Sequence, residues 1–350
     1  MIRVGIIGTG YIADEHAKGY QSIPDRCRII AVADIVEDKA KQKCKEWGAD
    51  KYYTDYTDLL DDEDIDAVSI CLPHHLHAEA CIKAAEANKH ILVEKPFTRT
   101  VKEADEVCRV VQKRKVKLMV AHNQLFFPAV IQAKKYLDEG YLGTVTMVNS
   151  YSMWRLPLRE RSEWGWRLDL QKAGGGTLID TGMHRIYLAR YFGGEVEQVA
   201  AHINNLYFKE IVGMQGEDTA SVIMKFKNGA LGLSQVCIGA YNPSPYQEWV
   251  EIYGTEGSIK VVTGYGLPHL MMNIGNELLM YSSKLPGIEK SQVHLWYPPE
   301  NCYIKEVQHF IDCIVNNRVP LVTEQDGRAC IEIVEAAYNA ANKGITVKLP

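Results

Sequence analysis

Near its amino terminus the chain reads Met1-Ile2-Arg3-Val4-Gly5-Ile6-Ile7-Gly8-Thr9-Gly10-Tyr11-Ile12-Ala13. A β-branched run leads directly into the pattern Gly8-x-Gly10-x-x-Ala13, which opens a predicted helix. The first glycine allows a tight turn, the second lets the main chain approach a pyrophosphate, and Ala13 lets helix and strand pack closely. Free N–H groups at the start of the helix favour phosphate. The stretch predicts a dinucleotide-binding turn, with a tight turn that binds nothing as the alternative.

The next predicted strand ends in Ala33-Asp34, 21 residues beyond Ala13. A carboxylate there can accept hydrogen bonds from the adenosine ribose, and it would repel a 2′-phosphate. No arginine follows within several residues. We therefore expect NAD rather than NADP. In the glycine turn, the expected cofactor contacts are Gly8, Thr9, Gly10, Tyr11 and Ile12.

Short β-branched runs alternate with helical stretches through the first third of the chain. This rhythm predicts right-handed βαβ units and a doubly wound parallel sheet, the Rossmann arrangement of α/β proteins. We place this NAD-binding domain at residues 1–121. The predicted strands are Arg3–Ile7, Ile29–Ala33, Lys51–Tyr53, Ala67–Cys71, Ile91–Val93 and Lys117–Ala121, and the predicted helices are Glu37–Trp47, His77–Asn88 and Val101–Lys113.

Residues 122–350 predict a second, α+β domain for substrate binding and oligomerisation. Helices are expected at Ala129–Gly140 and Thr177–Phe192, and a large, mostly antiparallel, open-faced sheet from Glu195 to Tyr281. A hairpin is expected at Asn228-Gly229, because both positions tolerate positive φ, and a second one at Gly254-Thr255-Glu256-Gly257. A broad apolar sheet face favours an oligomer interface. Two helices near 303–342 close the chain, and packing back toward the first domain is an alternative placement for them.

Composition narrows the class of protein. The 350 residues are 24% charged and 47% hydrophobic, with a net charge of −5, which is typical of a soluble globular protein and not of a nucleic-acid binder. We see no signal peptide and no apolar run of roughly 18 residues that could span a membrane. Nine cysteines lack CxxC spacing, so we expect reduced thiols, a cytoplasmic protein and no metal site.

Glu94-Lys95-Pro96 follows the fifth predicted strand, at the carboxyl edge of the sheet. Ligands bind at that edge in doubly wound folds. The Lys95 ammonium could therefore stabilise alkoxide character on a reacting oxygen. The alternative interpretation is a surface Lys–Pro loop.

Asp180 and His184 lie four residues apart in the predicted helix, so they would share one face. The carboxylate could orient the imidazole and hold its cationic form, and the imidazole could take a hydroxyl proton. The preceding run Gly174-Gly175-Gly176 would allow the close approach of another main chain. A helix-starting Asp and a solvent-facing His are the alternative.

The glycine turn, Asp34, the Pro73 segment, Glu94-Lys95-Pro96 and the glycine run with Asp180 and His184 follow one another along the chain. This order of motifs resembles that of the Gfo/Idh/MocA oxidoreductases, and the resemblance covers essentially the whole chain. It implies that Lys95 contacts both the nicotinamide ribose and the substrate, that His184 is the acid/base, and that Asp180 supports it. It also implies that the Pro73-x-x-x-His77 segment lies by the cofactor, and that the sheet builds dimers or tetramers. The expected cofactor contacts outside the glycine turn are Asp34, Leu72, Pro73, His74, His77, Glu94, Lys95, Asn123, Trp166 and Arg167.

The chain departs from the family pattern in three places. Many members have N-R-R-F after the sixth strand, where this chain has His122-Asn123-Gln124-Leu125-Phe126. Many place an Asp three residues after the catalytic His, where this chain has Tyr187, and the Pro73 segment carries His74-His75 in place of an Asn. These changes bear on which substrate fits.

The segment Trp154–Arg167 holds three of the six tryptophans and four arginines. Tryptophan faces can stack on sugar rings, and arginine can fork onto a carboxylate or phosphate. One interpretation is therefore a sugar-selecting loop, and the other is an interface loop with Arg–Trp stacking. The expected substrate contacts are Lys95, His122, Asn123, Trp154, Arg167, Asp180 and His184.

Together these features predict an enzyme that transfers a hydride between NAD and a hydroxyl-bearing carbon of a sugar, sugar acid or cyclitol. Two alternatives use the same residues: a glycoside hydrolase that retains NAD, and a sugar–sugar oxidoreductase with tightly bound cofactor. A non-catalytic nucleotide sensor is a third. The presence of Lys95, Asp180 and His184 argues against the sensor, because such a protein has no need of them.

Overall fold

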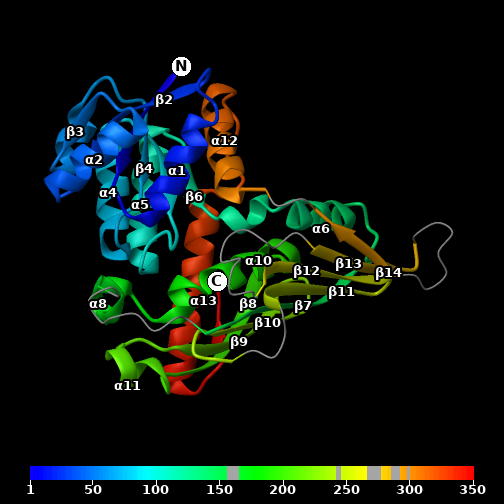
Figure 1. Ribbon diagram of the computed structural model, residues 1–350. Helices are drawn as coiled ribbons and strands as arrows, with labels where there is room; N and C mark the ends of the chain where they lie inside the picture. Colours follow the sequence, from blue (N-terminus) through cyan, green and yellow to red (C-terminus); the bar gives the residue numbers. More distant parts are fainter. Residues whose placement is uncertain (156–164, 242–245, 266–276, 285–291, 298–299) are drawn as a thin grey trace. The chain divides into compact units, whose positions relative to one another are not determined.

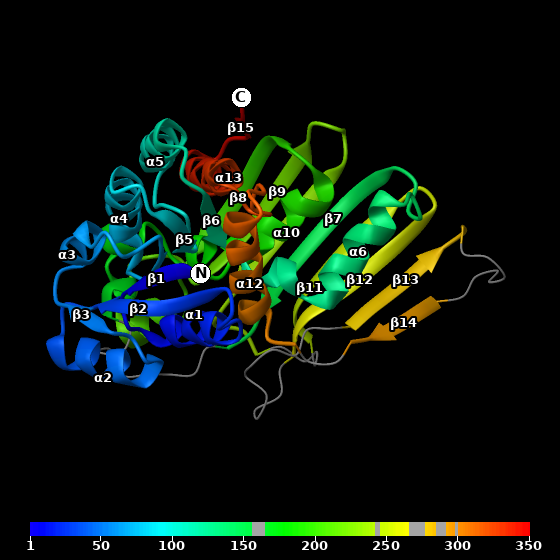
Figure 2. The same ribbon diagram turned by 90° about the horizontal axis from the view of Figure 1, so that it is seen from above.

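The computed structural model describes residues 1–155, 165–241, 246–265, 277–284, 292–297 and 300–350 (Figures 1 and 2). The chain divides into two compact units. The first comprises Met1–Asn123 with Cys302–Ile331, and the second comprises Gln124–Asn301 with Glu332–Pro350. The first unit therefore uses two separate stretches of sequence.

The first unit contains a six-stranded parallel sheet, ordered β3-β2-β1-β4-β5-β6, which confirms the predicted doubly wound arrangement. All four residues of β4 and of β6 are buried. Helices on both faces of a parallel sheet bury such strands, so the strand sequences are almost continuously apolar. The strands are β1 Ile2–Ile7, β2 Cys27–Ala33, β3 Lys51–Tyr53, β4 Ala67–Ile70, β5 His90–Glu94 and β6 Leu118–Ala121.

The helices of the first unit include one from the carboxyl-terminal part of the chain. Helix α12 packs on α1 so closely that a Cβ at Gly19 would lie 2.6 Å from the Cβ of Val307 (Figure 1). The Val120 N–H also donates to the Val322 carbonyl at 3.1 Å, which ties this stretch to β6. The helices are α1 Tyr11–Gln21, α2 Glu37–Trp47, α3 Tyr56–Asp61, α4 His74–Glu86, α5 Val101–Arg114 and α12 Cys302–Val315, and α13 Glu324–Lys343 begins in this unit.

The second unit contains a nine-stranded sheet, ordered β14-β13-β12-β11-β7-β10-β9-β8-β15. Neighbours pair antiparallel except β7 with β10. The hairpins expected at Asn228-Gly229 and Gly254–Gly257 are confirmed, and Gly229 has φ +91°. The strands are β7 Val145–Met153, β8 Val196–Asn204, β9 Thr219–Phe226, β10 Leu231–Cys237, β11 Tyr246–Gly254, β12 Gly257–Tyr265, β13 Glu277–Ser282, β14 Gln292–Trp296 and β15 Val347–Lys348.

Strand β7 lies inside this sheet but was not predicted. Its inward-facing side chains are Val148, Ser150 and Ser152, so the strand lacks the apolar alternation that marks a half-buried strand. Polar partners compensate, because the Ser150 hydroxyl lies 2.7 Å from that of Ser234 and 3.1 Å from the Arg185 carbonyl.

Helices cover one face of the nine-stranded sheet, as Figure 2 shows for α6 and α10. None of the helices among the described residues is long and apolar enough to cross a membrane. The remaining elements are η1 Asn123–Phe126, α6 Pro128–Asp138, η2 Gly165–Leu168, α8 Leu170–Ala173, α9 Thr177–Asp180, α10 Met183–Gly193 and α11 Phe208–Val212.

The prediction of one helix over Thr177–Phe192 was wrong, because α9 and α10 are separate. The Gly182 N–H donates to the Thr177 carbonyl, five residues back, at 2.7 Å, and the His184 N–H donates only three residues back, to Thr181, at 3.3 Å. A local shift to i−5 bonding interrupts the regular ladder, and such shifts often occur at functional sites. Asp180 therefore ends α9 while His184 lies in the first turn of α10.

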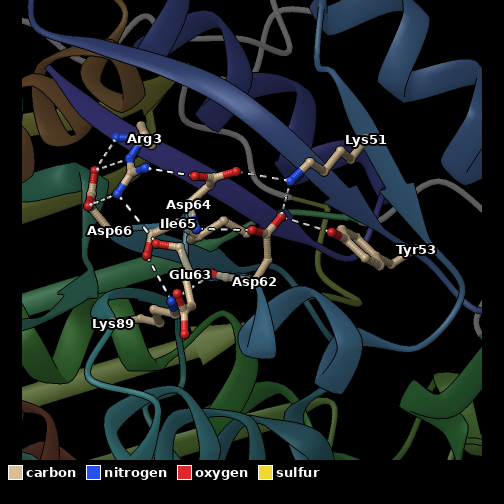
Figure 3. Close-up of polar contacts among 9 residues, drawn as sticks. All are labelled: Arg3, Lys51, Tyr53, Asp62, Glu63, Asp64, Ile65, Asp66 and Lys89. Carbon is tan, nitrogen blue, oxygen red and sulfur yellow. Dashed lines mark hydrogen bonds and ion pairs between the residues drawn. The ribbon is translucent and has the colours of Figure 1, made fainter.

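Charged side chains fasten the turn between α3 and β4, at the amino ends of the parallel strands (Figure 3). The Lys51 ammonium donates to the Asp62 carboxylate at 2.8 Å, and Arg3 forms two side-chain bonds to Asp66 at 3.0 and 3.1 Å. The Lys89 ammonium donates to the Asp62 and Ile65 carbonyls at 2.8 and 2.9 Å. These contacts close the edge of the sheet opposite the glycine turn.

We expect acid to weaken this turn. Burial would raise the pKa of Asp62, but Lys51, the Asp64 N–H and Tyr53 more than offset it and lower that pKa to about 2. The stabilisation is therefore complete above the unfolded pKa near 4 and is lost as the pH falls toward 2. Asp62→Asn should lower the free energy of unfolding by about 1 kcal/mol at pH 7 and by much less at pH 2.5. Urea unfolding at both pH values checks this, and an equal loss at both would contradict it.

Candidate active site

The glycine turn has the geometry that a dinucleotide requires. Gly8 has φ +90°, and a Cβ there would lie 2.4 Å from the Cys71 carbonyl oxygen, so only glycine fits. A Cβ at Gly10 would meet no atom within 4 Å, and no side chain caps α1 at this residue. Ala13 is completely buried. The start of α1 thus offers main-chain N–H groups and open space for a phosphate group.

The carboxylate of Asp34 is held at the end of β2. One oxygen accepts the Thr9 N–H at 3.0 Å and the Thr9 hydroxyl at 2.6 Å, and the other accepts the Val36 N–H at 2.9 Å. The next residue, Ile35, is 89% exposed. A fixed carboxylate beside exposed apolar surface suits an adenosine, because the ribose is polar and the base is flat and apolar.

Lys95 leaves the end of β5 through a constrained turn. Its N–H donates to the carboxylate of Glu94 at 3.0 Å, and the Lys95–Pro96 peptide bond is cis. The buried imidazole of His77 links this turn to the one after β4, with Nδ1 2.7 Å from the Pro96 carbonyl oxygen and Nε2 2.8 Å from that of Leu72. Burial lowers the pKa of His77, and the two carbonyls only partly offset it.

Other expected cofactor and substrate residues of the first unit are buried near these turns. The rings of His74 and His77 lie 5.8 Å apart, and both side chains are buried. His122 and Asn123 follow β6 and are also buried, and the Asn123 amide donates to the Cys302 sulfur at 3.3 Å. The sulfur comes from α12, so the carboxyl-terminal stretch contributes to this edge.

In the second unit, Asp180 pairs with Arg167. Arg167 Nε donates to an Asp180 carboxylate oxygen at 3.1 Å, and the guanidinium stacks 4.4 Å from the centre of the Trp166 ring. The Trp154 N–H donates to the Ser152 hydroxyl at 3.0 Å, and the Trp154 ring packs on a small apolar cluster. The cluster is Phe208, Val212, Met214 and Ile238. Residues 156–164 of the predicted loop lie outside the described residues.

A buried carboxylate positions the start of α9. Glu217 accepts the Gly176 N–H at 3.0 Å, the Leu178 N–H at 2.8 Å and the Tyr338 hydroxyl at 3.0 Å. Burial raises the pKa of Glu217, although these bonds partly offset it. A Cβ at Gly176 would lie 2.1 Å from the Glu217 carbonyl oxygen, which confirms the expected close approach of another main chain at the glycine run. Sequence reasoning missed Glu217 because its partners are distant in the chain.

Arg185, the residue after His184, anchors α10 on the sheet. Its side chain is completely buried, and its guanidinium donates to the Tyr151 carbonyl, the Thr263 hydroxyl and Gln124. Burial lowers the pKa of Arg185, and Glu248, 3.6 Å away, partly offsets this. The network fixes where α10 begins. Sequence reasoning missed Arg185 as well, because an arginine in a predicted helix is expected to lie on the surface.

Comparison with known proteins assigns the family. Residues 2–122 match the model of an oxidoreductase family with an NAD-binding Rossmann fold, and residues 134–349 match the model of its C-terminal alpha/beta domain. The chain belongs to the Gfo/Idh/MocA family of oxidoreductases.

Relatives of this Gfo/Idh/MocA chain are named as dehydrogenases. It is 30% identical to scyllo-inositol 2-dehydrogenase (NAD(+)) of Bacillus subtilis strain 168, over 99% of this chain and 96% of that one. It is 32% identical to levoglucosan dehydrogenase of Pseudarthrobacter phenanthrenivorans, over 74% and 73%. A solved levoglucosan dehydrogenase in complex with NADH and levoglucosan superposes with a TM-score of 0.89, at 27% identity, covering 100% of this chain and 99% of that one.

Proposed function

We propose that this oxidoreductase transfers a hydride reversibly between NAD and a carbinol carbon of a cyclic sugar, sugar acid or cyclitol. The observation that carries the proposal is the set of Lys95 at the carboxyl end of β5 and Asp180 and His184 at the α9–α10 break. These residue types can hold and move a proton beside a hydroxyl. The relatives named as inositol and levoglucosan dehydrogenases support the substrate class.

In this proposal each side chain has one task. When NAD is bound, nicotinamide C4 accepts or returns the hydride. The Lys95 ammonium contacts the substrate hydroxyl and stabilises negative charge on its oxygen. His184 takes the hydroxyl proton during oxidation, and Asp180 favours the imidazolium that forms. His122, Asn123, Trp154 and Arg167 are proposed substrate contacts.

Replacing the proton-handling groups should abolish most turnover without unfolding the protein. With the best substrate from a panel of sugars, cyclitols and sugar acids, Lys95→Ala and His184→Ala should each lower kcat about 10²- to 10⁴-fold. Lys102→Ala, which removes an exposed lysine from α5, is the matched control. NADH absorbance and thermal unfolding are the measurements. Wild-type turnover in Lys95→Ala would reject the role of that ammonium.

The NAD-retaining hydrolase would give a different result in the same assay. Glycoside cleavage without net NADH, from protein that carries NAD through purification, would favour it. The dehydrogenase proposal requires NADH to accumulate in proportion to the oxidised substrate.

We further propose that NAD is preferred over NADP. The fixed Asp34 carboxylate and the lack of an arginine among the residues that directly follow it support this preference, because a 2′-phosphate would meet negative charge. Asp34→Ala combined with Ile35→Arg should raise the ratio of kcat/KM for NADP over NAD at least about tenfold. Asp38→Ala removes an exposed carboxylate from the first turn of α2 and serves as control. An unchanged ratio in the double variant would contradict the role of Asp34.

The open face of the nine-stranded sheet is proposed as a homo-oligomer interface. Ile223 is 56% and Leu231 51% exposed, and they pair across strands with Leu233 and Lys225; Trp296 is 64% exposed at the sheet edge. Exposed apolar side chains on one sheet face favour association. Wild type should sediment as a dimer or tetramer, and Ile223→Glu should dissociate it, while Leu206→Glu, a control outside the sheet, should not. A monomeric wild type would contradict this interface.

All nine cysteines are free thiols, and seven of them are buried. This supports our proposal of a reducing, cytoplasmic environment.

A further inference from the structure

A chain of buried side chains runs beneath the turn that carries Lys95. His16 Nε2, from α1, lies 3.2 Å from a carboxylate oxygen of Glu94, at the end of β5. His16 Nδ1 lies 3.1 Å from the Ser69 hydroxyl of β4, which lies 2.7 Å from the Tyr20 hydroxyl of α1. His16 and Ser69 are completely buried, and Glu94 is 7% exposed. Three elements are thus joined by polar contacts inside the first unit.

This series of polar contacts ends at the main-chain N–H of Lys95. One Glu94 oxygen faces His16 while the other accepts the Lys95 N–H at 3.0 Å. Because both oxygens are engaged, the carboxylate cannot rotate without breaking a bond. The Glu94 carboxylate therefore connects His16 to the main chain of Lys95.

The His16–Glu94 bond is compatible with either protonation state of the imidazole. A neutral ring that carries its proton on Nε2 donates to Glu94 and accepts from Ser69, and a cationic ring donates to both. Burial alone would lower the pKa of His16, but the nearby Cys71 sulfur, 3.7 Å from Nδ1, and Glu94 more than offset it and raise that pKa well above its ordinary value.

A second carboxyl group is buried in the same region. Glu306 of α12 is completely buried, and burial raises its pKa well above the usual range, with Glu94 adding to the effect and His16 opposing it. A charged Glu306 would be a buried carboxylate without enough compensation, so Glu306 is held neutral.

We propose that His16 is a positioning residue for Lys95: by donating to Glu94, it fixes the carboxylate that holds the Lys95 main chain in the orientation needed for turnover. This inference rests on the proposed role of Lys95. It assigns a task to a histidine of the first helix, beyond the glycine turn. Without His16, Glu94 would turn toward another donor and the Lys95 ammonium would be displaced.

Three variants separate positioning from simple loss of stability. His16→Leu removes the donor, whereas His16→Gln keeps an N–H that can reach Glu94. Glu306→Gln is the matched control, because it replaces a neutral carboxyl in the same buried region with a neutral amide of similar shape. We would measure kcat, KM, NADH affinity and thermal unfolding for each.

His16→Leu should lower kcat about 10- to 100-fold while NADH affinity changes less than about threefold, because misplacement by about 1 Å is costly to turnover. His16→Gln should recover most of kcat, and Glu306→Gln should match wild type. If His16→Leu lowers only the unfolding temperature, or Glu306→Gln loses as much kcat, the proposal is overturned. If His16→Leu does not fold, the kcat of His16→Gln is compared with that of Glu94→Ala. A kcat of His16→Gln that is no higher than that of Glu94→Ala overturns the proposal.

A measurement without substrate distinguishes this proposal from failure of the proposed function. The rate at which Lys95 is acetylated by acetic anhydride, followed by peptide mass spectrometry, should change at least about threefold in His16→Leu and return toward wild type in His16→Gln. Lys102 in the same digests gives the reference rate. Should wild type turn over no sugar, this ratio still decides the case, and an unchanged Lys95 rate in His16→Leu refutes the positioning role.

Discussion

The parallel register of β1, β4 and β5 is the constraint on which the first unit depends. Ile7 of β1 pairs with Ile70 of β4, and Ile70 pairs with Val93 of β5, so the three strands end together. The glycine turn, the turn containing Leu72 and the turn containing Lys95 consequently share one edge. The charged cluster around Asp62 closes the other edge. The residues that stabilise the sheet through charge therefore lie at one edge, and the turns that can bind a nucleotide lie at the other. The second edge can then keep the open space that a nucleotide needs.

Buried polar contacts then refine what the strands bring together. His77 links the turns after β4 and β5, and the Glu94 carboxylate holds Lys95. In the second unit, Glu217 holds the start of α9 and Arg185 holds α10. In each contact, a charged or titratable side chain satisfies main-chain or buried polar groups. Removing one partner leaves the other buried and unsatisfied, so the loss of stability is larger than for an apolar contact. Such contacts make the geometry of the turns specific.

Local signals made the first unit predictable. The glycine turn, Asp34 and the alternation of strands and helices are short-range patterns, and the six parallel strands agree with them. Strand β7 was not predicted, because two of its inward residues are serines. The α9–α10 break was not predicted either, because Thr181 and Gly182 keep helical dihedral angles while the hydrogen bonds shift. Partners such as His16 and Glu94, or Glu217 and Tyr338, lie 78 and 121 residues apart, so no local pattern reveals them.

Isotope tracing is the sharpest test of hydride transfer to NAD. A cyclitol or sugar deuterated at the reacting carbinol carbon would be incubated with the protein and NAD, and the NADH formed would be analysed by NMR. We expect one deuterium at nicotinamide C4 for each molecule oxidised, with none exchanged into water. Deuterium that stays in the sugar product while no labelled NADH accumulates would rule out net hydride transfer to NAD.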